Sequence, residues 1–153
     1  MRIIGIDPGL LRTGYAVIEK HGNHFTIIAQ GLATTKKESI GNRLLSIYNK
    51  VSHIIEEYAP SSLAVESGFY SKNVDSLVKM SYVKGVVILA ARQKGIDISE
   101  YSPATVKMAI TGRGRATKEQ VKFMVEQILE QKIDGGYDIS DAISVALCHL
   151  YRQ

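Results

Sequence analysis

Residues 1–17 read MRIIGIDPGLLRTGYAV, and this stretch determines how the first part of the chain is built. Residues 2–7 form an Ile-rich apolar run, which predicts a strand, and residues 14–19 predict a second strand. Pro8 disfavours helix at Asp7 and keeps it extended, while Gly9 lets the chain turn away. Asp7 is therefore either the first residue of a turn or a ligand presented at the end of a strand.

The composition is that of a globular protein. The chain has 153 residues, of which 45% are hydrophobic and 22% are charged, with no low-complexity stretch or repeat. This length predicts one domain over residues 1–153. Without an apolar run of membrane-spanning length or a leader-like N-terminus, we expect a cytoplasmic protein that does not bind membranes. The single cysteine, Cys148, lies in an apolar helical pattern and predicts a buried thiol.

The positive charge is concentrated in the second half of the chain. The net charge is +4, and residues 72–122 contain ten Lys or Arg against four Asp or Glu, whereas the rest contains nine against eleven. A solvated surface explains such an excess, and so does a polyanionic partner such as nucleic acid. The charge pattern alone leaves both interpretations open.

The elements along the chain predict an α/β fold with a mixed sheet. A third strand is expected at residues 24–34, and short links between the first three strands favour an antiparallel meander. Strands and helices then alternate, which is typical of a mixed sheet flanked by helices. We expect further strands at residues 63–66 and 97–101, and helices at residues 39–58, 73–93, 103–110, 117–131 and 140–151.

Four acidic residues are expected to meet at one edge of this sheet. The strand at residues 63–66, reached through a crossover helix, can lie parallel to the first strand, about 4.8 Å away. Asp7 and Glu66 then end neighbouring strands and face one crevice, where open α/β sheets usually keep their sites. Asp138 lies near the start of the final helix, and Asp141, three residues on, shares its face.

Each acid taken singly has an ordinary structural explanation, but the set predicts a metal site. Two carboxylates about 4 Å apart repel by about 4 kcal/mol at an effective dielectric near 20, so the crevice needs cations or protons. Carboxylates and water suit magnesium or manganese, and two such ions can hold the attacking water and the leaving oxygen of a phosphodiester in line. The histidines do not cluster, which argues against zinc.

The motifs IDPGLLRTGYAV, AVESGFYSKNVDS, GRGRATKEQV and DISDAISVALCH resemble, in order and separation, those of the RuvC Holliday junction resolvases. The resemblance extends over essentially the whole chain. It implies a ribonuclease H-like fold with a mixed five-stranded sheet, a homodimer, and magnesium-dependent paired nicks in four-way DNA junctions. It further implies two magnesium ions per subunit, replaceable by manganese, and the branch-migration proteins RuvA and RuvB as partners.

The resemblance also assigns roles to residues of this chain. It matches four acids to the catalytic and metal-binding set, two lysines to residues important for cleavage, and one aromatic to a base-stacking residue; these are Asp7, Glu66, Asp138 and Asp141, then Lys107 and Lys118, then Phe69. Further candidates for DNA contact are Tyr70, Lys72, and Arg113 and Arg115 of the basic loop TGRGRAT, with Lys118.

Ser67, Ile139 and Ser140 depart from the pattern of well-known members. They leave open the preferred cleavage sequence and which of Asp138 and Asp141 contacts metal directly.

The helix at residues 73–93 is apolar nearly all round its second half, which indicates either a subunit interface or burial under later helices.

Three other functions compete with the resolvase interpretation. The closest is another ribonuclease H-like nuclease, acting on RNA–DNA hybrids or as a transposase. A noncatalytic junction-binding protein would explain the basic half of the chain but not the acidic crevice. Actin-like ATPases and sugar kinases share the strand, Asp-x-Gly turn and strand, but they need a second lobe for which 153 residues leave no room.

Overall fold

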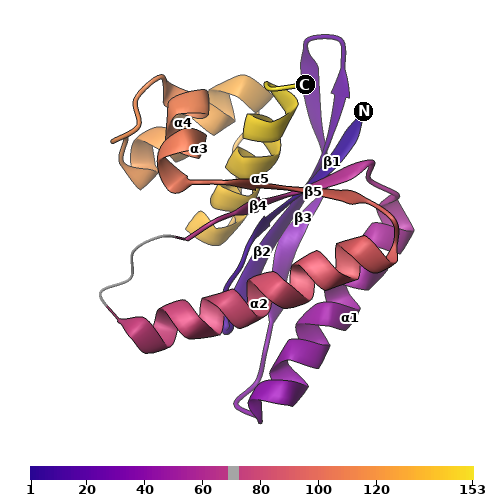
Figure 1. Ribbon diagram of the computed structural model, residues 1–153. Coiled ribbons are helices and arrows are strands. Elements are labelled where there is room, and N and C mark those ends of the chain that lie inside the picture. The colour runs from indigo at the N-terminus through magenta and orange to yellow at the C-terminus, as the bar shows by residue number, and fades with distance from the viewer. Residues whose placement is uncertain (69–72) are drawn as a thin grey trace.

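The computed structural model describes residues 1–68 and 73–153, and a five-stranded sheet in the order β3-β2-β1-β4-β5 forms its centre (Figure 1). Strands β1, β2 and β3 pair antiparallel, whereas β4 pairs parallel with β1 and β5 parallel with β4. The predicted mixed sheet is therefore confirmed. The strands are β1 (Arg2–Asp7), β2 (Arg12–His21), β3 (His24–Thr34), β4 (Ser62–Glu66) and β5 (Asp97–Tyr101).

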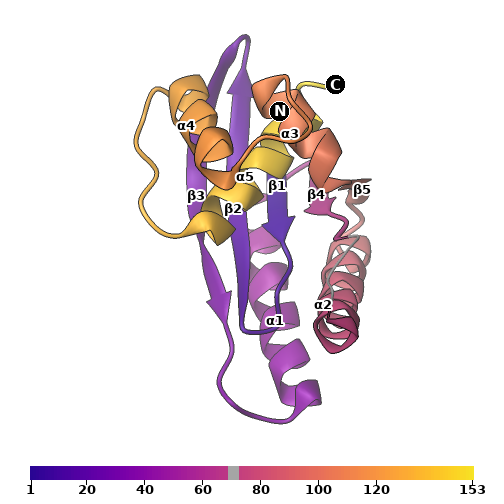
Figure 2. The same cartoon turned by 90° about the vertical axis from the view of Figure 1, so that its left-hand side faces the viewer.

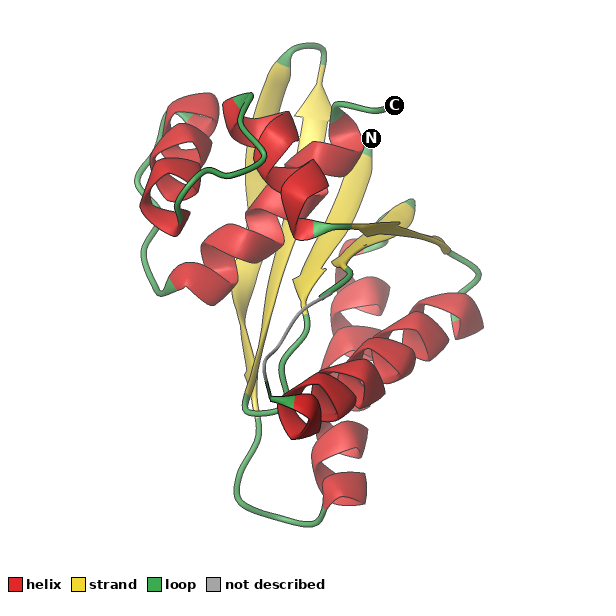
Figure 3. Cartoon of the chain, turned by 60° about the vertical axis from the view of Figure 1, so that its left-hand side comes forward, coloured by secondary structure: helices red, strands yellow, loops and turns green. Residues whose placement is uncertain are grey.

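The helices form two groups on opposite faces of the sheet (Figures 2 and 3). Helices can cover both faces because successive side chains of a strand point to opposite sides of the sheet. In β1, Ile3 packs with α5, while Ile4 and Ile6 pack with α1. One face carries α1 (Ile40–Tyr58) and α2 (Val74–Gln93), and the other carries α3 (Pro103–Thr111), α4 (Lys118–Leu129) and α5 (Tyr137–Leu150).

The helix starts follow their capping residues. Ser39, Ser102 and Thr117 accept hydrogen bonds from backbone N–H groups in the first turns of α1, α3 and α4. The predicted boundaries 117–131 were therefore slightly too wide for α4, because Thr117 is the cap and Glu130, in the left-handed region at φ 53°, ends the helix.

The final helix starts earlier than expected. The prediction placed its start at Ser140, but α5 begins at Tyr137, directly after the Gly135–Gly136 pair. These glycines break the preceding segment, and Gly136 is the N-cap. The extra turn places Asp138 inside the helix, in the same turn as Asp141.

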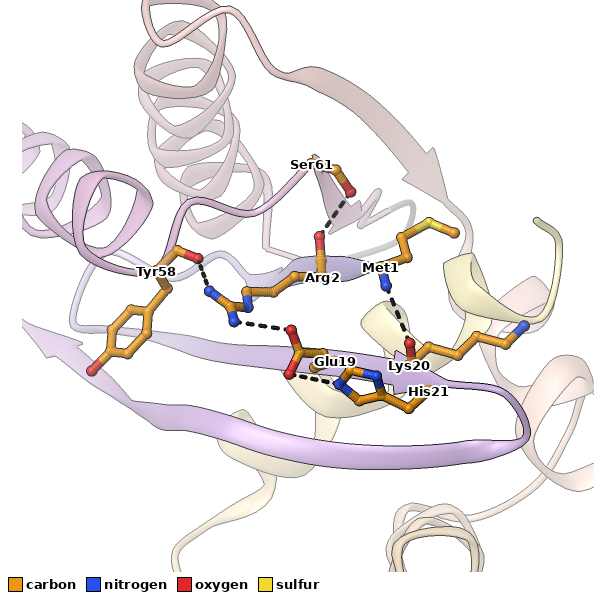
Figure 4. A network of polar contacts seen from close by, with 7 residues as sticks. All are labelled: Met1, Arg2, Glu19, Lys20, His21, Tyr58 and Ser61. Atoms are coloured by element: carbon orange, nitrogen blue, oxygen red, sulfur yellow. Dashed lines mark hydrogen bonds and ion pairs between the residues drawn. The ribbon is translucent and has the colours of Figure 1, made fainter.

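A polar network joins the end of α1 to the start of the sheet (Figure 4). The Arg2 guanidinium donates to the backbone oxygen of Tyr58 and to Glu19 Oε1, the latter at 2.9 Å. Ser61 donates to the Arg2 carbonyl through both its backbone N–H, at 2.8 Å, and its hydroxyl, at 2.9 Å. These bonds fix where β4 begins beside β1, and therefore where both strands end.

The end of α5 is buried against β4 and β5. His149 Nε2 lies 3.0 Å from Ser62 Oγ, and its Nδ1 lies 2.8 Å from the Tyr101 hydroxyl, so this histidine has a packing role. The neighbouring Cys148 is buried, as predicted. In residues 1–68 and 73–153, no helix combines the length and the apolarity that crossing a bilayer requires.

Candidate active site

Strand register brings Asp7 and Glu66 to one edge of the sheet. Ile6 pairs with Val65 across the parallel β1 and β4, so Asp7 and Glu66, the next residues, end adjacent strands. Ala64 packs in the core on the α5 side, and Glu66 follows it by two residues on the same face. Both carboxylates therefore point to the face that α5 covers.

Two glycines allow α5 to lie directly on the strands beneath it. A Cβ added to Gly14, the β2 partner of Asp7, would lie 2.1 Å from the carbonyl oxygen of Asp138. A Cβ on Gly5 would lie 2.1 Å from the carbonyl oxygen of Ala142. Sequence reasoning missed both contacts, although a glycine inside a strand is a known sign of close backbone approach.

This contact completes an acidic cluster, which we define as Asp7, Glu66, Asp138 and Asp141. Burial raises the pKa of Asp7 to about 8, assisted by the other three carboxylates, with Asp141 contributing most, and opposed by Lys118. Burial and then the charge of Asp141 raise the pKa of Glu66. The other three carboxylates thus all act on Asp7, which places it under the charge of the whole set.

The two predicted lysines stand beside the cluster. Lys118 Nζ lies 3.2 Å from Asp141 Oδ2 and forms an ion pair with it. The charge of Lys107 partly opposes the rise in the pKa of Glu66. A small cavity of about 140 Å³ collects these groups; its lining includes Glu66, Lys107, Lys118 and Asp141.

An arginine that the sequence analysis did not single out also reaches the cluster. Arg12 Nε, at the start of β2, lies 3.4 Å from Asp138 Oδ2. Arg12 belongs to the same opening motif as Asp7, but its partner is distant in sequence, so only the folded structure identifies the pair. The two aspartates of α5 are thus each paired with a cationic side chain.

The remaining candidates for DNA contact lie in the connection between α3 and α4 or outside the described residues. Arg113 and Arg115 are exposed in the connection between α3 and α4, where the Arg113 N–H donates to Thr111 Oγ1 at 3.1 Å. Phe69, Tyr70 and Lys72 lie outside the described residues.

The acidic cluster has the chemistry of a site for hard divalent cations. In the parts of the chain described, no three acidic, histidine or cysteine side chains stand close enough to hold an ion as they are placed. Asp141 and Asp138 are instead paired with Lys118 and Arg12, respectively. The four carboxylates are nevertheless oxygen donors of the kind that magnesium-like ions bind. Such ions would offset the burial and the repulsion that raise the pKa values of Asp7 and Glu66.

Known proteins that resemble this chain do so over nearly its whole length, and they are nucleases that act on DNA junctions by name. A family model described as crossover junction endodeoxyribonuclease RuvC matches residues 3–149. The protein of that name from Ruegeria pomeroyi is 40% identical over 151 residues, which cover 99% of this chain and 92% of the relative. The one from Natranaerobius thermophilus is 44% identical over 151 residues, covering 97% and 94%.

Solved structures agree with these matches. Thermus thermophilus RuvC in complex with Holliday junction substrate aligns with a TM-score of 0.93 at 30% identity, covering 99% of this chain and 94% of that one. The fowlpox virus resolvase, in a complex with Holliday junction DNA, aligns at a TM-score of 0.65 and 18% identity, covering 99% of both chains, and supports the fold alone. The ribonuclease H-like fold is therefore confirmed, and the chain belongs to the RuvC family of crossover junction endodeoxyribonucleases.

Proposed function

We propose that this chain is a Holliday junction resolvase, an endonuclease that nicks four-way DNA junctions during recombination and repair. RuvC-family proteins are divalent-metal-dependent nucleases. The observation that carries the proposal is the acidic cluster at the carboxyl ends of β1 and β4, closed by α5, in a chain of this family.

In this proposal the four carboxylates hold two magnesium ions per subunit, and manganese can replace them. The charges of Glu66, Asp138 and Asp141 all act on Asp7, so Asp7 would contribute to both ions, with Glu66 on one and Asp138 or Asp141 on the other. When bound, such ions lower the pKa of the attacking water and screen the charge on the phosphate, and hydrolysis leaves 5′-phosphate and 3′-hydroxyl ends.

The chain's own cations complete the site. Lys107 and Lys118 border the cavity beside Glu66 and Asp141, and their ammonium groups would stabilise negative charge that develops at the scissile phosphate. Arg113 and Arg115 are exposed and would bind the DNA backbone without reading its sequence. Phe69 is assigned base stacking by resemblance alone, with Tyr70 and Lys72 beside it as further contacts.

A second copy of the chain would cover an apolar stripe on α2. The stripe is defined by Val74, Val78, Tyr82 and Leu89, and their spacing places them on one side of the helix. Leu89 is 53% exposed and Tyr82 50%, whereas Val83 and Val87 are buried in the chain's own core. A twofold dimer through the stripe would present two acidic clusters to the two opposed strands of a junction.

The remaining features of the proposal follow from this substrate. A junction resolvase works in the compartment that holds the DNA, which for a bacterial-type family is the cytoplasm. One domain over residues 1–153 would carry the whole activity. Family resemblance adds RuvA and RuvB as partners that supply the junction.

The test compares how this one protein cleaves three different nucleic acid substrates. A labelled four-way junction, a duplex and an RNA–DNA hybrid of matched sequence are incubated with the chain and magnesium. We expect paired symmetric nicks in the junction and little cutting of the other two. Preferential cutting of the hybrid would favour a ribonuclease H activity instead, and binding without cutting in magnesium and in manganese would contradict any nuclease function.

A pair of variants links the cutting to the cluster. Asp7→Asn removes one carboxylate at the centre of the cluster and should abolish cutting while junction binding persists. Asp97→Asn is the matched control, because Asp97 lies at the start of β5 with its side chain 92% exposed, and it should cut normally.

A further inference from the structure

Tyr137, the first residue of α5, joins the starts of two helices. Its hydroxyl donates to Glu119 Oε1 at 3.0 Å, and the Lys118 ammonium lies 5.6 Å from the centroid of its ring. We propose that Tyr137 is a positioning residue that holds the Lys118 ammonium at the acidic cluster. This inference deepens the proposed function and rests on the role given there to Lys118.

Lys118 needs such support because its side chain is long and solvent-accessible. The side chain is 60% exposed, and a flexible four-carbon stem lets an ammonium sample many positions. Holding it in one place costs rotamer entropy that specific contacts must offset. Lys118 makes two such contacts, the ion pair with Asp141 at 3.2 Å and the approach to the Tyr137 ring.

The ring is itself anchored to the helix that carries Lys118. Glu119 is the next residue of α4 and lies in its first turn, where the helix dipole favours a carboxylate. The Glu119 backbone N–H and then the Tyr137 hydroxyl lower the pKa of Glu119, so it stays ionised as an acceptor. Glu119, the ring, Lys118 and Asp141 thus form a closed set that ties the start of α4 to the start of α5.

The ring contact differs from the ion pair in one functional respect. A carboxylate that holds a divalent cation attracts a lysine less strongly, whereas the attraction between an ammonium and an aromatic face does not depend on that carboxylate. Tyr137 therefore keeps Lys118 near the cluster when Asp141 is engaged elsewhere. Its ring contributes little to the core, because Tyr137 is 39% exposed while Ile139 turns inward.

Two substitutions separate the ring from its hydroxyl. Tyr137→Leu removes the ring, and we expect the single-turnover rate of junction cleavage in magnesium to fall about two- to fivefold, the value of one exposed cation–π contact. KM should not change, and any loss of thermal stability should be shared by Tyr137→Phe, which also lacks the hydroxyl bond to Glu119. Tyr137→Phe keeps the ring and should retain most of the rate. Phe123→Leu, which removes an exposed aromatic from the same helix as Lys118, is the control and should cleave normally.

A double-mutant cycle shows whether Tyr137 acts through Lys118. In a Lys118→Gln background the proposal predicts that Tyr137→Leu has no further effect on the rate, because the group it positions is gone. An equal loss in both backgrounds would overturn the proposal and indicate a general structural role. An unchanged rate for Tyr137→Leu in the wild-type background would also overturn it.

A measurement without metal or substrate tests the contact itself. The ε-methylene signal of Lys118 in a ¹H–¹³C spectrum should carry a ring-current shift that Tyr137→Phe keeps and Tyr137→Leu abolishes. Signals that are the same in all three proteins would overturn the proposal. If the wild-type chain failed to cut junctions, the proposed function would fall, and this spectrum would still decide whether Tyr137 holds Lys118.

Discussion

Replacing Gly14 by alanine tests whether close contact between α5 and β2 positions the acidic cluster. The new Cβ would lie 2.1 Å from the Asp138 carbonyl oxygen, and the first turn of α5 would have to move about 1.3 Å to restore the 3.4 Å of ordinary contact. The backbone of residue 14 fixes the position of the new Cβ, and the atom that it meets is a backbone oxygen, so no side-chain rotation relieves the clash. Overpacking of this kind costs about 1–3 kcal/mol of folding free energy. Displacing a reacting group by about 1 Å costs about 100-fold in rate.

The assay pairs urea unfolding with single-turnover junction cleavage in magnesium. Gly14→Ala should unfold at lower urea and cleave about 100-fold more slowly, while its junction affinity without metal should stay the same. Gly41→Ala is the control, because nothing lies within 4 Å of a Cβ built there and alanine is the better helix former. Wild-type stability and cleavage in Gly14→Ala would refute the reasoning, since α5 could not then lie where the contact requires.

Three further predictions concern charge and assembly. Because the pKa of Asp7 is raised from 3.8 to about 8, the folded chain binds a proton there that the unfolded chain has released, so metal-free stability should fall as the pH rises between these values. Thermal unfolding across that range should show the fall, magnesium should reduce it, and Asp7→Asn should make it smaller, leaving the part due to the raised pKa values of Glu66 and Asp141. Replacing Arg113 and Arg115 by alanine should weaken junction binding on all sequences and make the logarithmic salt dependence shallower by about one for each phosphate that these arginines neutralise, as measured by anisotropy titrations at several salt concentrations. Leu89→Glu should yield monomers in light scattering, with unchanged secondary structure by circular dichroism, because Leu89 belongs to the exposed apolar stripe on α2.

The positions of Asp7 and Glu66 could be predicted from sequence because they depend on local rules. The two-residue period of a strand fixes which face each side chain takes, and a crossover helix makes β4 parallel to β1. These rules place both carboxylates at one edge without knowledge of any other contact. The same reasoning predicted the order of the elements and, apart from the start of α5, placed their ends within two residues; β2, predicted at residues 14–19, is Arg12–His21.

The geometry around α5 could not be predicted, because it depends on contacts between residues far apart in the chain. The start of the helix was placed three residues late, since the Gly135–Gly136 pair gives no signal of which later residue enters the helix. The close approach to Gly14 and the ion pair between Arg12 and Asp138 arise only when α5 is laid on the sheet. Hydrophobic periodicity indicates which face of a helix is buried, but not how near its backbone lies to a strand.

The charges of the acidic cluster are balanced in two different ways, and this difference determines how metal binding depends on pH. Asp138 and Asp141 are paired with Arg12 and Lys118, although burial still raises the pKa of Asp141. In residues 1–68 and 73–153, no ion pair reaches Asp7, and its raised pKa means that a proton balances its charge instead. If Asp7 holds a divalent cation as proposed, the cation would displace that proton, and we expect binding to release it and to strengthen as the pH approaches about 8. Displacing the arginine and the lysine from their aspartates would need no change in protonation, and under the proposed function their charge would then be available to the phosphate.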